Sequence, residues 1–78
     1  MYDDIVLFVH IVRQQGLAPA AQKLGLPAAT VTRRLQRLEA SAACKLIHRS
    51  ARQFVFTPDG EAFYLAYAGL VEQLEQTQ

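Results

Sequence analysis

The sequence predicts a small, mainly α-helical domain, and three observations support this fold class. Of its 78 residues 51% are apolar and 19% are charged, and four Gly with three Pro are too few for a disordered chain. Apolar residues recur every three or four positions in several segments, as they do on one face of a helix. Proline and glycine lie near the ends of these segments, where helices commonly begin and end.

Composition also excludes several classes of protein. Cys44 is the single cysteine, so neither an internal disulfide nor a multi-cysteine zinc site is expected. The longest apolar run, Ile5–Val9, is too short to cross a bilayer, and acidic residues stand where a secretory leader would be basic. We therefore expect a cytoplasmic protein with no membrane partner.

Neither catalysis nor metal binding is expected. The sequence contains no Ser-His-Asp set, no paired catalytic carboxylates and no phosphate-binding loop, so the protein is predicted not to be an enzyme and to need no cofactor. His10 and His48 are far apart in the sequence and have no third ligand nearby, so no metal site is predicted. We expect His10 on a helix surface and Cys44 as a small apolar filler.

Three helices are predicted in the first part of the chain, over Asp3–Gln15, Pro19–Leu24 and about 28–41. Gly16 and Gly25 end the first two, and Pro27 precedes the third. Asp3 and Asp4 lie where an N-cap and the helix dipole favour carboxylates. Because two helices joined by a tight turn with glycine form a helix-turn-helix, this motif is predicted for the second and third.

The charges are unevenly distributed along the chain. Residues 23–52 contain seven Lys or Arg against one Glu, net +6, whereas residues 1–22 carry −1 and residues 53–78 carry −4, which together make the overall +1. A basic middle between acidic ends suggests a positive face directed at a polyanion. A solvated helix face would give the same charge run, so this alternative stays open.

The third predicted helix separates apolar from basic residues. Val31, Leu35 and Leu38 form one apolar stripe, and the opposite side carries Arg33, Arg34, Arg37 and Thr30. Its N-terminal turn, with Ala28 and Ala29, is slim enough to approach base edges in a DNA major groove. A surface helix in which Glu39 supports its basic neighbours remains the alternative.

A small β-hairpin is predicted after this helix, followed by a long helix. Leu46–Arg49 and Gln53–Phe56 are short runs around a polar connection, and they carry Arg49 and Arg52. Such a basic protrusion, about 46–56, suits contacts with the DNA backbone or minor groove. Thr57 and Pro58 then begin a helix that extends to the chain end.

The long helix carries an apolar seam of Phe63, Tyr67, Leu70 and Leu74 at coiled-coil spacing. The first half is expected to cover the domain's own core, which is the interpretation we favour for Phe63. The domain is too small to reach Leu74, so a partner is expected there. We predict a homodimer that uses Tyr67, Leu70, Val71 and Leu74.

An ordered set of short motifs covers nearly the whole chain. They are Ala20-Ala21-Gln22-Lys23-Leu24-Gly25, Val31-Thr32-Arg33-Arg34-Leu35, Leu38-Glu39, Leu46-Ile47-His48-Arg49 and Phe56-Thr57-Pro58-Asp59-Gly60-Glu61. The set resembles the N-terminal DNA-binding domain of LysR-type transcriptional regulators. The resemblance implies a winged helix-turn-helix, of three helices plus a small β-hairpin wing, over residues 1–57. It also implies a linker and dimerisation helix over 58–78, and an effector-sensing domain that is absent here, so we expect a fragment of a longer protein.

The family resemblance also implies the DNA contacts. Base contacts map onto Ala28, Ala29, Thr30, Thr32 and Arg33, and backbone contacts are expected from Arg34, Arg37, Arg49 and Arg52. The expected partner is an imperfectly palindromic double-stranded DNA operator, bound by a homodimer, and an effector ligand would bind only the absent domain. The alternative function is a protein-interaction module that docks through the C-terminal helix.

Some residues depart from the family pattern. Ala42-Ala43 stands where the family has Leu-Gly, which removes a residue suited to a left-handed cap, so the end of the third helix is expected to be reshaped or extended. Pro27 replaces a Ser, Ile47 a Phe, and Gln53 a Gly of the wing. None of these changes removes a basic position, so the expected fold is unaffected and the sequence preference is left open.

Overall fold

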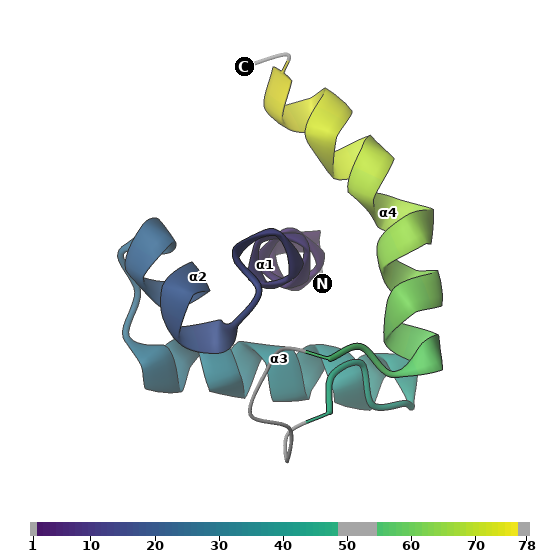
Figure 1. Ribbon diagram of the computed structural model, residues 1–78, viewed down its shortest axis with the longest axis horizontal. Coiled ribbons are helices and arrows are strands. Elements are labelled where there is room, and N and C mark those ends of the chain that lie inside the picture. The colour runs from purple at the N-terminus through teal and green to yellow at the C-terminus, as the bar shows by residue number, and fades with distance from the viewer. Residues whose placement is uncertain (1, 49–54, 77–78) are drawn as a thin grey trace.

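The computed structural model describes residues 2–48 and 55–76 (Figure 1). It contains four helices, α1 (Tyr2–Gln14), α2 (Leu17–Leu24), α3 (Ala28–Ala42) and α4 (Pro58–Gln76). In Figure 1, α1 is seen nearly end-on at the centre, with α2 on one side, α4 on the other and α3 crossing beneath. The mainly helical fold with a helix-turn-helix is confirmed.

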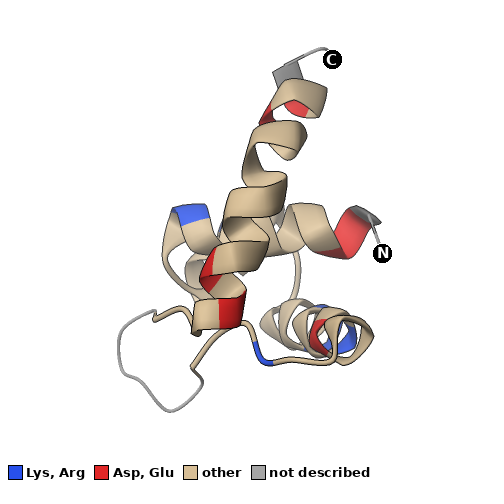
Figure 2. Cartoon of the chain, turned by 90° about the vertical axis from the view of Figure 1, so that its right-hand side faces the viewer, with Lys and Arg blue, Asp and Glu red and all other residues tan. Residues whose placement is uncertain are grey.

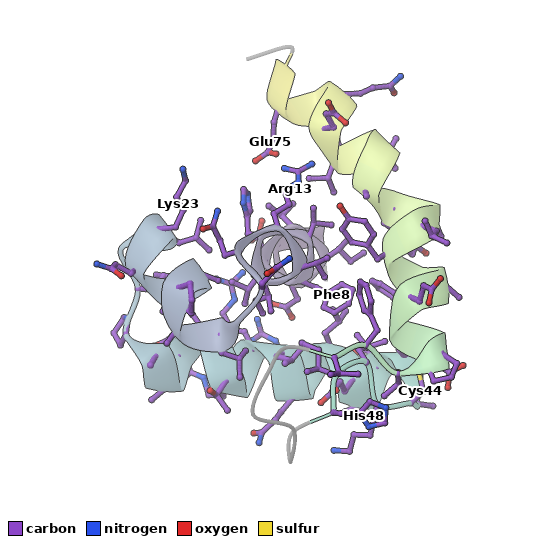
Figure 3. The ribbon with its side chains drawn as sticks, in the orientation of Figure 1. Phe8, Arg13, Lys23, Cys44, His48 and Glu75 are labelled. Carbon is purple, nitrogen blue, oxygen red and sulfur yellow. The ribbon has the colours of Figure 1, made fainter. Side chains whose placement is uncertain are left out.

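The core lies where α1 meets the other three helices. Phe8 is fully buried and projects from α1 into the space between α3 and α4 (Figure 3). Its ring packs edge-on against Phe63 of α4, with 5.6 Å between the ring centroids. The buried cluster consists of Leu7, Phe8, Ile11, Ala20, Ala21, Val31, Leu35, Leu38, Leu46 and Ile47. The apolar stripe predicted for the third helix therefore faces the core, and Phe63 covers it as expected.

The residue that terminates the first helix differs from the one predicted. Gln15, not Gly16, adopts the left-handed conformation, with a φ of 59°, and the Gly16 N–H donates to the Ile11 carbonyl at 3.1 Å. Gly16 itself is extended and precedes α2, which begins two residues earlier than predicted, at Leu17. Pro19 is tolerated there because the N–H groups of a first helical turn have no partner within the helix.

The recognition-helix candidate, α3, has well-formed ends. Pro27 precedes it in an extended conformation, and its carbonyl accepts from the N–H of Thr30 at 3.0 Å. At the other end Ala43 takes the left-handed conformation, with a φ of 58°, and the Cys44 N–H donates to the Glu39 carbonyl. The expectation of a reshaped or extended helix end is therefore wrong. Alanine keeps the left-handed cap, because the hydrogen bonds from the N–H groups of Ala43 and Cys44 to the carbonyls of Ala40 and Glu39 outweigh its unfavourable φ.

This strained cap predicts that Ala43→Gly stabilises the protein by about 1 kcal/mol, since glycine reaches a positive φ without a Cβ clash. The urea midpoint of unfolding, measured at fixed protein concentration, would rise. Gly25→Ala is the matched control, because Gly25 occupies the corresponding cap of α2 with a φ of 69°, and its midpoint would fall. An unchanged or lower midpoint for Ala43→Gly would contradict the strain argument.

The predicted hairpin is represented by a single antiparallel bridge between Ile47 and Phe56 within the described residues. The His48 N–H donates to the Val55 carbonyl at 3.0 Å, which continues the pairing by one residue. The remainder of the wing, residues 49–54, lies outside the described residues.

The start of α4 follows the prediction closely. The Thr57 hydroxyl accepts from the Gly60 N–H at 2.9 Å and also donates to the Lys45 carbonyl, so it caps the helix and anchors it to the segment after α3. The Thr57 N–H in turn donates to the Leu46 carbonyl at 3.1 Å.

The C-terminal end of α4 remains in contact with α1, although the sequence predicts that the domain is too small to reach Leu74. Val71 is only 1% exposed, and Glu75 lies within hydrogen-bond distance of His10, at 3.0 Å, and accepts from Arg13 at 3.2 Å (Figure 3). The hydrogen bond with His10, and then that with Arg13, lowers the pKa of Glu75. Two expectations are corrected: His10 is largely covered rather than on the surface, and the domain does reach the end of α4.

Candidate nucleic-acid interface

The N-terminal end of α3 presents small and polar side chains to solvent. Ala28 and Ala29 are exposed, Thr30 and Thr32 are half-buried, and Arg33 is exposed. The leading turn is thus slim, as the sequence predicts, and Arg33 is an exposed cation beside it. A helix of this kind fits a DNA major groove without a bulky side chain at its tip.

The other two arginines of α3 bind a carboxylate of α1. Arg37 donates through Nε and Nη2 to the two oxygens of Asp4, both at 2.8 Å. Arg34 donates through Nε to Oδ1 at 3.0 Å. The acidic N-terminal turn of α1 lies directly above α3 in Figure 2, which makes this contact possible.

Asp4 is almost completely buried, with 4% of its side chain exposed. The hydrogen bond from Arg37 is the largest influence on its ionisation and, with that from Arg34, lowers the pKa of Asp4 from 3.8 to about 2 despite burial. The same hydrogen bond raises the pKa of Arg37. Asp4 is thus ionised at neutral pH, and its negative charge neutralises part of the positive charge of these two arginines.

Sequence reasoning assigned Asp4 to the helix dipole and missed its role. The signal was present in the spacing, because Asp4, Phe8 and Ile11 follow at i, i+4 and i+7 and so share the core-facing side of α1. A carboxylate on that side requires cationic partners, since an unpaired buried charge is costly. Arginines on a facing helix are such partners.

Glu39 is another buried carboxylate, 4% exposed, and does not act as a surface charge. Its Oε2 accepts from the Leu46 N–H at 2.8 Å and so anchors the start of the wing to α3. The expected wing cations Arg49 and Arg52 lie outside the described residues. His48 and Lys45 beside them are exposed, and Cys44 packs partly against the core as expected.

Within the described residues, no group of three or more His, Cys, Asp or Glu side chains is placed to hold a metal ion. None of the described helices is both long enough and apolar enough to span a membrane.

Comparison with known proteins identifies the protein family of this chain. Residues 2–61 match the profile described as bacterial regulatory helix-turn-helix protein, lysR family. The chain belongs to the LysR family. An HTH-type transcriptional regulator of Xanthomonas campestris pv. campestris (strain 8004) is 33% identical over 76 residues, which cover 97% of this chain and 22% of that protein. The chain thus spans about a fifth of the length of the curated LysR-family relatives it matches.

Two solved structures of the family resemble this chain closely. The full-length structure of the Vibrio cholerae virulence activator AphB has a TM-score of 0.94 and 36% identity, over 99% of this chain and 27% of that chain. The DNA-binding domain of BenM, from Acinetobacter baylyi, was solved in complex with catB site 1 DNA. It has a TM-score of 0.90 and 28% identity, over 99% of this chain and 86% of that chain.

The LysR-family chain also presents an apolar row on α4. Tyr67, Leu70 and Leu74 of the predicted dimer contacts are 37%, 55% and 40% exposed. Val71 is instead buried within the chain, so its assignment to a partner contact is corrected. On α4, Phe63 packs against Phe8 of α1 and Glu75 contacts His10 and Arg13 of α1, whereas Tyr67, Leu70 and Leu74 of the predicted seam are each more than a third exposed.

Proposed function

We propose that this chain is the sequence-specific DNA-binding region of a LysR-type transcriptional regulator and acts in the cytoplasm. The observation that carries the proposal is the N-terminal half of α3, which exposes Ala28, Ala29 and Arg33, rests on a buried core through Val31 and is preceded by the tight turn at Gly25. The similarity to the BenM DNA-binding domain, which was crystallised with DNA, supports the same function. In this proposal residues 1–57 form the DNA-binding unit and residues 58–78 the linker helix.

The roles follow from chemistry and exposure. The methyl groups of Ala28 and Ala29 suit apolar contact with thymine, whereas the Thr30 and Thr32 hydroxyls can donate to or accept from base edges. Arg33 has the two-donor fork that fits guanine O6 and N7. Arg49 and Arg52 of the wing supply backbone contacts.

A homodimer would place two copies of α3 on an imperfect palindrome. The row of Tyr67, Leu70 and Leu74 supports α4 as the dimer contact, since each of these large side chains exposes more than a third of its surface. Sedimentation of the chain at several concentrations tests the dimer. A protein-interaction module that uses the same row is the alternative, and it would be favoured if partner binding survived charge reversal at Arg33.

The DNA proposal predicts that Arg33→Ala weakens specific binding by about 1–3 kcal/mol and relaxes the preference at one base pair. Binding is measured in a salt series on two duplexes. The first is selected by the wild-type chain from a random pool, and the second is its scrambled version.

Lys23→Ala serves as the control, because Lys23 is an exposed cation that points away from the core at the end of α2 (Figure 3). It removes the same charge and is expected to leave the preference between the two duplexes unchanged. Equal weakening of both duplexes by Arg33→Ala would show a phosphate contact instead of a base contact. A wild-type chain that selects no sequence and binds neither duplex at low salt would contradict the proposed function.

A further inference from the structure

We propose that Asp4 is a positioning residue that determines which arginines of α3 read DNA. By holding Arg34 and Arg37, it occupies the Nε–H of both, so the Nε–Nη2 edge of neither is available for phosphate or guanine, and Arg33 is left as the reading arginine of the helix. This inference rests on the proposed DNA binding and assigns different roles within the basic face of α3, which the sequence treats as one surface.

The hydrogen bonds of Arg37 show how Asp4 competes with DNA for this side chain. An arginine binds phosphate or guanine strongly when two parallel N–H groups reach two acceptors. Arg37 already uses such an edge, because its Nε and Nη2 each donate to a different oxygen of Asp4 at 2.8 Å. Asp4 therefore occupies the Nε–Nη2 edge of Arg37, where it takes the place of a phosphate or a guanine edge.

Because Asp4 is buried, its ion pairs with Arg34 and Arg37 are expected to persist when DNA binds. The side chain of Asp4 is 4% exposed and that of Arg34 is 20% exposed, so withdrawal of the arginines would leave an ionised carboxylate buried without partners. Phosphate at the surface cannot compensate for that loss. The side chain of Arg37 is 63% exposed, but two of its N–H groups are bound to this buried carboxylate. The cluster keeps one net positive charge, which still attracts DNA at long range.

The same contacts set the rotation of α3 about its axis. Positions 34 and 37 are adjacent on one side of the helix, and both are tied to the first turn of α1. Arg33 lies next to Arg34 in the chain but about 100° around the helix, and it is exposed. Within the described part of the chain, the arginine ion pairs of α3 involve Arg34 and Arg37 but not Arg33. Its fork is thus available for a base.

The test compares Asp4→Asn with Asp3→Asn in the 78-residue chain. Both changes remove one negative charge from the first turn of α1, but Asp3 is exposed. Binding to the selected and scrambled duplexes is measured across a salt series at a temperature where circular dichroism shows each variant folded. In Asp4→Asn, each freed arginine is expected to add about 0.9 to the log–log salt slope, and the preference for the selected duplex to fall about tenfold. In Asp3→Asn, slope and preference stay near wild type.

A second variant keeps the proposal testable if Asp4→Asn does not fold. Arg37→Gln leaves Asp4 paired with Arg34, and its salt slope is expected to equal that of the wild type because Arg37 is not on a phosphate. A slope lower by about 0.9 in Arg37→Gln, or no difference between Asp4→Asn and Asp3→Asn, would overturn the proposal. If the wild-type chain binds no DNA, the proposed function fails, and this outcome is distinct from a wild-type chain that binds while the Asp4 variant behaves as the control.

Discussion

Gly60→Ala is expected to destabilise the protein by about 3 kcal/mol, which is a large part of the stability of so small a domain. A Cβ at position 60 would overlap the carbonyl oxygen of Leu46 and lie 2.8 Å from its carbonyl carbon. These are backbone atoms and cannot rotate away. Leu46 is fully buried, and its carbonyl accepts from the Thr57 N–H, so any shift that makes room also disrupts the core and the start of α4.

Gly69→Ala provides the matched control on the same helix. No atom lies within 4 Å of a Cβ at position 69, and alanine favours a helix interior by about 1 kcal/mol over glycine. The urea midpoint is therefore expected to fall sharply for Gly60→Ala and to rise for Gly69→Ala, at one protein concentration. Similar midpoints for the two variants would show that α4 can move away from Leu46 at little cost.

Asp4→Asn is expected to lower the free energy of unfolding by about 2 kcal/mol at neutral pH. The pKa of Asp4 is about 2 in the folded chain against an ordinary value of 3.8, and each unit of difference between folded and unfolded chain corresponds to about 1.4 kcal/mol. Because the folded pKa is the lower one, this stabilisation is present above about pH 4 and is lost as the pH falls toward 2.

Urea unfolding of wild type and Asp4→Asn at several pH values tests this linkage. The difference in stability between them should be largest near pH 7 and shrink between pH 4 and pH 2, since other carboxylates titrate alike in both. Asp3→Asn, at the exposed neighbouring position, is expected to cost less than about 1 kcal/mol. A difference between wild type and Asp4→Asn that does not vary with pH would mean that the buried ion pairs do not lower the pKa of Asp4.

Much of the fold was predictable because it depends on local patterns. Helical periodicity placed Val31, Leu35 and Leu38 in the core, and Thr57 was recognised as an N-cap from its position before Pro58. The slim and exposed turn at Ala28 followed from residue size alone. Helix ends were predicted less well, because the left-handed caps at Gln15 and Ala43 use residues that do not favour this conformation on their own.

The sequence by itself determined the number and order of the helices, the apolar stripe of α3 and the basic character of its opposite side. Only the tertiary structure decided which charged side chains form ion pairs or buried hydrogen bonds. Asp4 binds Arg34 and Arg37, which lie some 30 residues further along the sequence, and Glu39 accepts a hydrogen bond from the Leu46 N–H after a turn of the chain. The tertiary structure also decided that Val71 is buried and that Glu75 contacts α1, whereas Leu70 is 55% exposed. Periodicity finds an apolar side of a helix, but the direction of that side depends on how two helices pack against each other.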